Sequence, residues 1–138
     1  MFIDASVIVA ILGREPGYEE LEKRLADGQG PFFVSPLVKF EASVALARQK
    51  SMKRKPTAGL MRQAWKAVDA FIEDIAADEV AISQEIGRLT LEASATYGKA
   101  IGHVADLNFG DCFAYACAKG LKVSLLYKGY DFAHTDLT

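Results

Sequence analysis

The sequence has little cysteine, little histidine and no strong excess of charge of either sign. Its 138 residues include two cysteines and two histidines, and 16 Lys and Arg residues balance 18 Asp and Glu residues, for a formal net charge of -2. Without a general basic field, a nucleic-acid substrate would have to be held locally or through metal ions. The cysteines, Cys112 and Cys117, stand five residues apart in an expected helix and so on different faces, which argues against a disulfide or a zinc pair.

Long apolar runs and nucleotide-binding glycine motifs are also missing. The apolar stretch from Ala5 to Leu12 is far too short to span a bilayer, and the amino end lacks the basic segment and cleavage site of a signal peptide. We therefore expect a cytoplasmic protein in a reducing compartment. Neither G-x-G-x-x-G nor G-x-x-x-x-G-K-[ST] occurs, which excludes dinucleotide-binding and P-loop motifs. His103 and His134 are isolated, and we interpret them as ordinary surface side chains.

The chain does have enough apolar sequence, 51% hydrophobic residues, to bury one core. Short apolar runs at 2–4, 32–35, 79–82 and 122–127 predict strands, and apolar residues at helical spacing predict helices over 5–12, around 18–25, and over 36–50, 57–76, 83–97 and 109–120, the last closed by Gly120. Strands alternate with helices and are apolar on both faces. We expect a single domain over residues 1–138, an α/β three-layer sandwich with a mainly parallel sheet of four to five strands.

Two of these helices have an apolar stripe whose members can be named. In the helix over 36–50, the spacing predicts that Leu37, Phe40, Val44 and Ala47 line one apolar face, with Glu41 near it. In the helix over 57–76, Trp65 is expected to belong to a broad apolar stripe. Ser35 is expected to cap the first of these helices, with a proline at its first position.

Four acids stand where a parallel sheet would gather them. Asp4 ends the first strand, Glu41 lies two turns into the helix after the second, Asp111 is in the first turn of a late helix, and Asp131 follows the last strand. Ligands bind outside the carboxyl ends of parallel strands. Without a counterion, each like-charge pair at about 4 Å would repel by about 4 kcal/mol at an effective dielectric constant of about 20. Mg²⁺ or Mn²⁺ would supply that counterion, and two such ions catalyse phosphodiester hydrolysis.

Each acid also has a purely structural interpretation. Asp4 could cap the helix that follows it, and Asp111 could form a capping box with Asn108. Glu41 could face solvent, and Asp131 could be a turn residue. Spacing alone leaves both interpretations open.

Four stretches resemble the motifs of the PIN-domain ribonucleases, and within them of the VapC-type toxins of bacterial toxin–antitoxin pairs. MFIDASVIVAIL resembles the opening motif, a strand ending in Asp followed by x-Ser or x-Thr, and SPLVKFEASVAL resembles the second acidic motif. LNFGDCFAYACAKG is the most specific match, and LLYKGYDFAHTDL resembles the closing segment of one branch of these toxins. The resemblance extends over essentially the whole chain.

The resemblance implies Mg²⁺- or Mn²⁺-dependent endonucleolytic cleavage of RNA. Asp4, Glu41 and Asp111 would be metal ligands, and Ser6 would orient Asp4 or a water on the metal. The fourth acid departs from the pattern, because many relatives have Thr-x-Asp directly after the last long strand, where this chain reads Tyr-Lys-Gly. Asp131, two residues later, is then the nearest substitute, and Lys128 could instead contact a substrate phosphate.

The same resemblance implies partners. A VapB-like antitoxin would cover the acidic cleft and apolar grooves, and the helices around Leu37–Ala47 and Leu60–Ile75 could offer such grooves or the face of an expected homodimer. Two other interpretations stay open. The chain could be a PIN-like binding or DNA-associated partner with weak catalysis, as the altered fourth acid allows. It could also be a Mg²⁺-dependent phospho-acceptor signalling domain, for which Lys128 fits but the single Asp4 does not.

Overall fold

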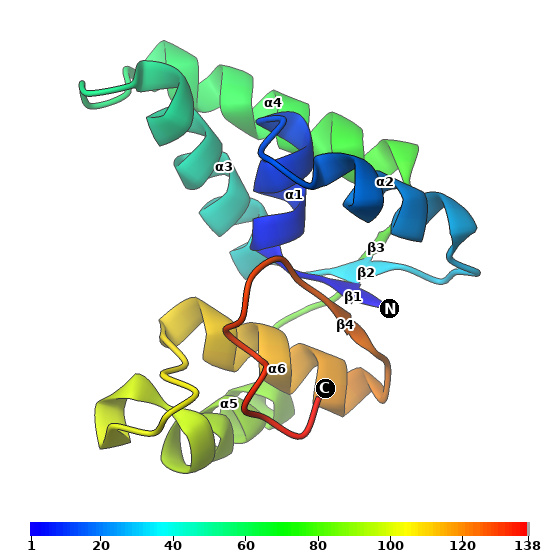
Figure 1. Cartoon of the computed structure of the whole chain (residues 1–138), viewed down its shortest axis with the longest axis vertical. Helices are drawn as coiled ribbons and strands as arrows, with labels where there is room; N and C mark the ends of the chain where they lie inside the picture. The colour runs from blue at the N-terminus through cyan, green and yellow to red at the C-terminus, as the bar shows by residue number, and fades with distance from the viewer. Residues whose placement is uncertain (138) are drawn as a thin grey trace.

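A short parallel sheet separates two layers of helices. The computed structural model describes residues 1–137. Helices α1 to α4 lie on one side of the sheet and α5 and α6 on the other, as Figure 1 shows. The expected α/β three-layer fold with a parallel sheet is confirmed. Within the described residues the elements are β1 (Phe2–Ile3), α1 (Ala5–Leu12), α2 (Tyr18–Asp27), β2 (Phe33–Val34), α3 (Pro36–Ser51), α4 (Ala58–Asp74), β3 (Asp78–Glu79), α5 (Gln84–Tyr97), the 3₁₀ helix η1 (Lys99–Ile101), α6 (Phe109–Leu121) and β4 (Leu125–Leu126).

The order of the strands places β1 at the centre of the site. The sheet runs β3-β2-β1-β4 and all its pairs are parallel. The chain therefore steps outward from β1 to β3 and returns on the other side of β1 as β4. Such a reversal is the topological switch point at which α/β sheets bind ligands. Asp4 leaves β1 at this point, and its backbone N–H donates to the carbonyl of Leu126 at the end of β4 (3.0 Å).

The core forms around β1 and α1 because both consist almost entirely of apolar residues. Phe2 and Ile3 have no exposed surface, and Val7, Ile8 and Ala10 of α1 have none either. A strand covered by helices on both faces needs an apolar run of this kind. Burial of a side chain of Ile or Phe size contributes about 1.5–3 kcal/mol. The start of α1, with Asp4 before it, is therefore fixed by the best-packed part of the molecule.

Hydroxyl side chains cap three of the helices at their amino ends. Ser35, Thr57 and Ser83 each accept a hydrogen bond from the backbone N–H three residues later, at 3.2, 3.1 and 3.2 Å. Pro36 occupies the first position of α3, as expected. A side-chain oxygen at this place pairs one of the backbone donors that the first turn leaves without an intrahelical partner. The predicted cap of α3 is confirmed.

Several element boundaries differ from the sequence prediction, among them those of the fourth strand, which is Leu125–Leu126 and not 122–127. The third strand is Asp78–Glu79 and not 79–82, because its partner β2 gives way to α3 at Ser35, and the last ladder bond runs from the Val80 N–H to the Val34 carbonyl (2.8 Å). Gly120 does not close α6, which continues to Leu121. A Cβ on Gly120 would lie 2.6 Å from the end of Ile86, so this glycine allows α5 and α6 to pack closely.

The apolar stripes predicted for α3 and α4 are only partly buried. Phe40 is 65% exposed and Trp65 is 53% exposed. The face of α3 that packs on α1 and α4 instead carries Val38, Ala42 and Leu46. An apolar helix offers more than one stripe at helical spacing, and here the stripe with the small alanine lets neighbouring helices approach. The large aromatic rings of both helices are left at the surface.

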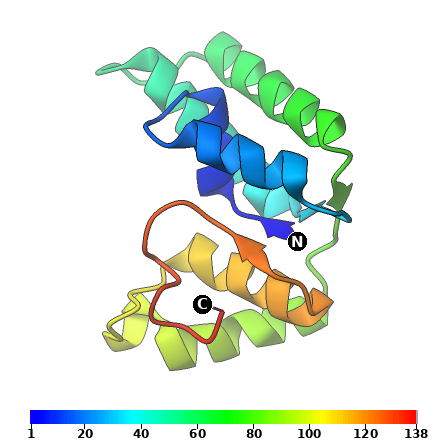
Figure 2. The ribbon, with the colours of Figure 1, turned by 45° about the vertical axis from the view of Figure 1, so that its right-hand side comes forward.

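The carboxyl-terminal segment lies against α6 (Figure 2). Tyr115 donates a hydrogen bond to Asp136 (2.6 Å), and Lys119 pairs with the other oxygen of that carboxylate (2.7 Å). Phe132 is buried and packs edge-on against Tyr127. These contacts hold the segment that follows β4, so the loop at residues 128–131 is anchored on both sides.

Among the described residues, no helix is long and apolar enough to cross a membrane.

Candidate active site

Asp4 is a buried carboxylate at the junction of β1 and α1. It is 7% exposed and accepts two hydrogen bonds from Ser6, one from the backbone N–H (3.0 Å) and one from the hydroxyl (2.5 Å). Burial raises the pKa of Asp4, and the bonds from Ser6 oppose that rise. Asp4 is therefore the helix cap that the structural interpretation required. Both bonds from Ser6 go to the same carboxylate oxygen, so the other oxygen of Asp4 can bind a ligand.

Glu41 faces the first turn of α6 from the middle of α3. Its pKa is raised to about 7, first by burial and then by the charges of Asp4 and Asp111. The carboxylate occupies the space next to Gly110, where a Cβ would collide with it. Glu41 is thus not a solvent-facing residue, and the glycine before Asp111 is required for α3 and α6 to come together at this point.

Asp111 is also held by its local structure. Its carboxylate accepts a hydrogen bond from the Asn108 N–H (3.0 Å), and its own N–H donates to the Asn108 side chain (2.9 Å), which is a capping box. The pKa of Asp111 is raised to about 6, first by burial and then by the charges of Asp131, Asp4 and Asp106, while the hydrogen bond from the Asn108 N–H lowers it. Like Asp4, Asp111 therefore has two roles: its carboxylate caps a helix and also belongs to the group of acids at the candidate site.

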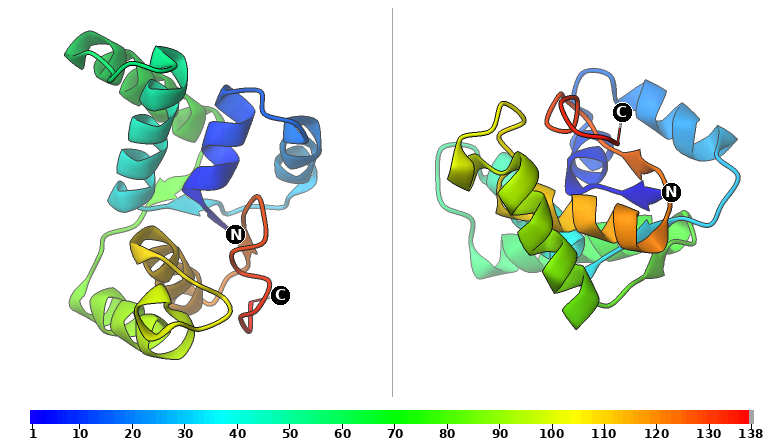
Figure 3. Two further views of the ribbon diagram at one scale, coloured as in Figure 1. Left: turned by 60° about the vertical axis from the view of Figure 1, so that its left-hand side comes forward. Right: turned by 90° about the horizontal axis from the view of Figure 1, so that it is seen from below.

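Asp131 completes a group of four acids. It is exposed, and its charge raises the pKa values of both Asp4 and Asp111. Each of these four acids therefore interacts electrostatically with at least two of the others, and we call Asp4, Glu41, Asp111 and Asp131 the acidic edge. Figure 3 shows the loop after β4 near the start of α1. The convergence expected from strand order occurs, although the residues come from both ends and the middle of the chain.

A hollow of about 410 Å³ opens beside the acidic edge. Its walls are Ala5, Ser6, Val9, Glu15, Glu41, Ala45, Lys128 and Gly129. The Lys128 N–H donates to the Ser6 hydroxyl (3.0 Å), and its ammonium pairs with Glu15 (2.6 Å). Glu15 also accepts a hydrogen bond from Gln49 (2.7 Å). Sequence reasoning missed Glu15 and Gln49, because nothing in the GREPG turn or in the last turns of α3 indicates that they meet.

The donor set of the acidic edge suits a hard divalent cation. Among the described residues, no three acidic, histidine or cysteine side chains already stand in metal-binding geometry. Yet Asp4, Glu41 and Asp111 offer carboxylate oxygens, which are the ligands that Mg²⁺ and Mn²⁺ prefer. Each is held by the fold, and burial and mutual repulsion raise the pKa of all three. A divalent cation would relieve that repulsion, so these residues are suited to hold Mg²⁺ or Mn²⁺.

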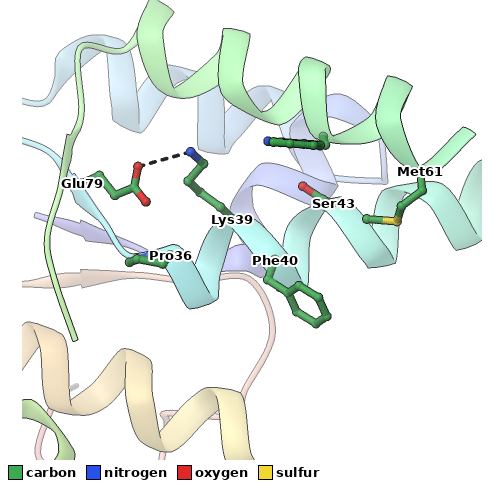
Figure 4. A pocket seen from close by; sticks show the side chains of 7 residues that line it. Pro36, Lys39, Phe40, Ser43, Met61 and Glu79 are labelled. Carbon is green, nitrogen blue, oxygen red and sulfur yellow. Dashed lines mark hydrogen bonds and ion pairs between the residues drawn. The ribbon is translucent and has the colours of Figure 1, made fainter. Parts of the chain in front are cut away.

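A second hollow, of about 320 Å³, lies between α3 and α4 (Figure 4). It is lined by Pro36, Lys39, Phe40, Ser43, Met61, Trp65 and Glu79. The Lys39 ammonium pairs with Glu79 (3.2 Å) and with Asp69 (2.9 Å), so its charge is compensated by these two carboxylates. Most of the other side chains that line the hollow are apolar. None of the four acids lines this hollow, and its exposed Phe40 and Trp65 belong to a surface distinct from the acidic edge.

Comparisons with known proteins identify the family. The PIN-domain family model matches residues 1–137. A VapC ribonuclease of Rhizobium meliloti (strain 1021) is 53% identical over 139 residues, covering 99% of this chain and 98% of that protein. Ribonuclease VapC42 of Mycobacterium tuberculosis is 31% identical over 137 residues, covering 99% of this chain and 96% of that protein.

Solved structures share the fold at low sequence identity. Mycobacterium tuberculosis VapC20, described as a sarcin-ricin loop cleaving toxin, has a TM-score of 0.73 at 14% identity, covering 99% of this chain and 95% of that one. A toxin–antitoxin complex from Klebsiella pneumoniae has a TM-score of 0.66 at 16% identity, covering 98% and 92%. The family match and the close relative confirm the resemblance seen in the motifs. This chain belongs to the PIN-domain family and, within it, to the VapC ribonucleases.

Proposed function

We propose that this protein is a toxin-type endoribonuclease that hydrolyses RNA phosphodiester bonds with a divalent cation held at the acidic edge, and that a cognate antitoxin neutralises it. The observation that carries the proposal is the electrostatic convergence of Asp4, Glu41 and Asp111 at the switch point of the sheet. A fold that needed Asp4 and Asp111 only as caps would gain no stability from bringing them and Glu41 close together. The VapC ribonucleases to which the chain is similar support the same activity.

Asp4, Glu41 and Asp111 would hold the cation, with Asp131 contributing a fourth negative charge from the loop after β4. When bound, Mg²⁺ or Mn²⁺ supplies Lewis acidity that lowers the pKa of water and stabilises negative charge on a phosphate. No protein side chain then has to act as the nucleophile. The roles of the four acids in the chain are to attract the cation, to orient its ligand oxygens and to keep the site at one edge of the sheet.

Ser6 fixes the orientation of Asp4. A serine hydroxyl has one proton. The Ser6 oxygen accepts the Lys128 N–H (3.0 Å), so its proton is directed to the Asp4 carboxylate (2.5 Å). This chain of hydrogen bonds ties the end of β4 to the end of β1. It supports the orienting role that the resemblance implies for Ser6.

The alternative functions are less well supported. A PIN-like partner without catalysis would have no need of three acids whose pKa values are raised by burial and mutual repulsion. A phospho-acceptor domain requires a lysine directed at the acidic site, whereas the Lys128 ammonium pairs with Glu15. Membership of the VapC ribonucleases also favours the nuclease over both.

We assign the antitoxin to the hollow between α3 and α4. Its occupant would be an amphipathic helix with apolar side chains that pack on Phe40 and Trp65, the exposed rings on either side. The Klebsiella pneumoniae complex, which shares this fold, contains a toxin and its antitoxin. A reducing, cytoplasmic location is supported by Cys112 and Cys117, which are buried free thiols. The homodimer expected from the sequence stays a prediction, for which sedimentation analysis of the free chain is the test.

The test of the proposed function is cleavage of a mixed pool of single-stranded and structured RNA by the purified, antitoxin-free protein. We expect cleavage in Mg²⁺ or Mn²⁺, none in EDTA, and none by the Asp111→Asn variant. Asp27→Asn is the matched control, because Asp27 is exposed at the end of α2 and the change in charge is the same. Absence of cleavage by folded wild-type protein would refute the nuclease and favour the binding partner.

A further inference from the structure

The loop after β4 brings a cation to the hollow beside the acidic edge and carries an exposed aromatic ring next to Asp131. Lys128 and Gly129 line the same hollow as Ser6 and Glu41. Among the described residues that line it, Lys128 is the only cation. Tyr130, which follows Gly129, is 88% exposed. A positive charge and an exposed aromatic ring, here two positions apart, are the two kinds of group that proteins use to hold single-stranded nucleic acid.

Lys128 is fixed at both its backbone and its ammonium group. Its N–H donates to Ser6, which itself donates to Asp4, so a single residue separates Lys128 from the acidic edge. Its ammonium pairs with Glu15, which Gln49 holds from α3. The side chains of Lys128 and Glu15 are 34% and 29% exposed. An ion pair with this much contact with water is weak, and a phosphate can compete for the ammonium.

Space is available for a polymer to approach this loop. Gly129 has a φ of +97°, and no atom lies within 4 Å of where a Cβ would stand. The backbone between Lys128 and Tyr130 therefore presents no side chain and has open space in front of it. An extended RNA strand could lie along the loop without displacing any part of the fold.

We propose that residues 128–130 bind single-stranded RNA beside the acidic edge, with the Lys128 ammonium on a phosphate that flanks the scissile one and the Tyr130 ring stacked on an unpaired base. The proposal rests on the proposed function and adds the residues that hold the RNA strand beside the acidic edge. An ammonium has three donors, so Lys128 contacts a phosphate while Glu15 still orients it. A base inside a duplex is stacked on its neighbours and offers no face to Tyr130, so the loop selects single strands.

The first experiment measures RNA binding without cleavage. Wild-type and variant full-length chains are titrated into a fluorescein-labelled single-stranded RNA in EDTA, and anisotropy is followed at several salt concentrations. We expect Lys128→Met to weaken binding about fivefold to tenfold and to reduce the slope of log K against log salt by about 0.7, the value for one phosphate contact on a single strand. Lys128→Arg should retain most of the affinity.

The matched control is Lys119→Met. Lys119 also pairs with an acid, Asp136 at 2.7 Å, and its loss changes the net charge equally, but it lies on α6 and does not line the hollow. We expect wild-type affinity and slope from this variant. A loss equal to that of Lys128→Met would mean that only overall charge matters, and the proposal would be wrong.

The Glu15→Gln variant should change RNA affinity in the opposite direction from Lys128→Met. Without its carboxylate partner the ammonium is freer to bind phosphate, so we expect RNA affinity to rise about threefold. The double variant Lys128→Met/Glu15→Gln has the net charge of the wild type, and we expect it to bind more weakly than the wild type. A merely structural ion pair would instead lower the melting temperature in both single variants and leave RNA affinity unchanged.

Tyr130 is tested with single-stranded and duplex RNA of the same length. Tyr130→Ala should weaken binding to the single strand at least fivefold, Tyr130→Phe should not, and duplex binding should not change, because base stacking on the ring requires an unpaired base. If Tyr130→Ala binds single-stranded RNA as tightly as the wild type does, the proposed stacking on Tyr130 is wrong.

These results separate failure of the loop assignment from failure of the proposed function. If the wild type binds and cleaves RNA and the Lys128 and Tyr130 variants behave like it, the assignment of residues 128–130 is wrong and the nuclease stands. If the wild type neither binds nor cleaves RNA, both proposals are wrong. If the wild type binds in EDTA but does not cleave in Mg²⁺ or Mn²⁺, the loop variants still decide the binding site while the nuclease fails.

Discussion

Replacing Glu41 with glutamine should stabilise the metal-free protein and abolish its cleavage of RNA. Burial and the charges of Asp4 and Asp111 raise the pKa of Glu41 from 4.5 to about 7. Because the charged form is disfavoured in the folded state, the wild type loses stability as the pH rises from about 4.5 to 7, and the loss is complete above 7. Glutamine has the same shape without the charge, so the variant avoids this loss.

The magnitude follows from the pKa. At about 1.4 kcal/mol for each pKa unit, the shift sets an upper limit of about 3 kcal/mol on the destabilisation by Glu41. Water reaches part of this carboxylate and screens its charge, so about 1–2 kcal/mol is expected. For a chain of this length that corresponds to a rise in melting temperature of about 3–6 °C at pH 8. At pH 5, where the folded-state carboxyl is mostly protonated, the difference should be small.

The assay is thermal unfolding in EDTA at pH 5 and pH 8, with Glu92→Gln as the control. Glu92 is exposed on α5, so its replacement should change little at either pH. Excess Mn²⁺ should reverse the order, because a bound cation stabilises the wild type and the variant has lost one ligand. If Glu41→Gln melts with the wild type at pH 8, or differs from it equally at both pH values, the account of this carboxylate is wrong.

Three further variants test how the acidic edge is held. Gly110→Ala should displace the Glu41 carboxylate, because its new Cβ would collide with it; we expect cleavage to fall at least tenfold with the fold retained by circular dichroism, and unchanged activity would refute the contact. Ser6→Ala removes both hydroxyl bonds, and we expect metal affinity to fall about tenfold as the orientation of Asp4 is lost, with Ser83→Ala as the comparison. Asp131→Asn should reduce cleavage less than Asp111→Asn does, and equal severity would show that Asp131 is a full ligand.

The sequence was enough to predict the positions of the acids because local patterns specify them. A single carboxylate at the end of an apolar strand located Asp4, and the Asn108–Asp111 spacing located the start of α6. Both signals depend on residues close in the chain. The order of strands and helices followed from the same kind of pattern, since apolar strands alternating with helices allow few arrangements.

Contacts between distant segments could not be read in this way. The collision that forbids a side chain at Gly110 comes from Glu41, which is 69 positions earlier in the numbering. The pairing of Lys128 with Glu15 joins two loops that no periodicity connects. The sequence left the exposure of Phe40 undecided for a related reason, because the choice between two apolar stripes of α3 is made by the helices that pack on it.

The central claim is that the four acids meet in order to hold a divalent cation, and direct titration of Mn²⁺ tests it. Free Mn²⁺ is followed by electron paramagnetic resonance as wild type, Asp4→Asn, Asp111→Asn and the control Asp27→Asn are added at pH 6 and pH 8. The account predicts one or two ions bound by the wild type and by Asp27→Asn, more tightly at pH 8 because Glu41 and Asp111 must lose their protons, and at least tenfold weaker binding by the other two. Equal binding by all four chains, or RNA cleavage that persists in EDTA, would contradict it.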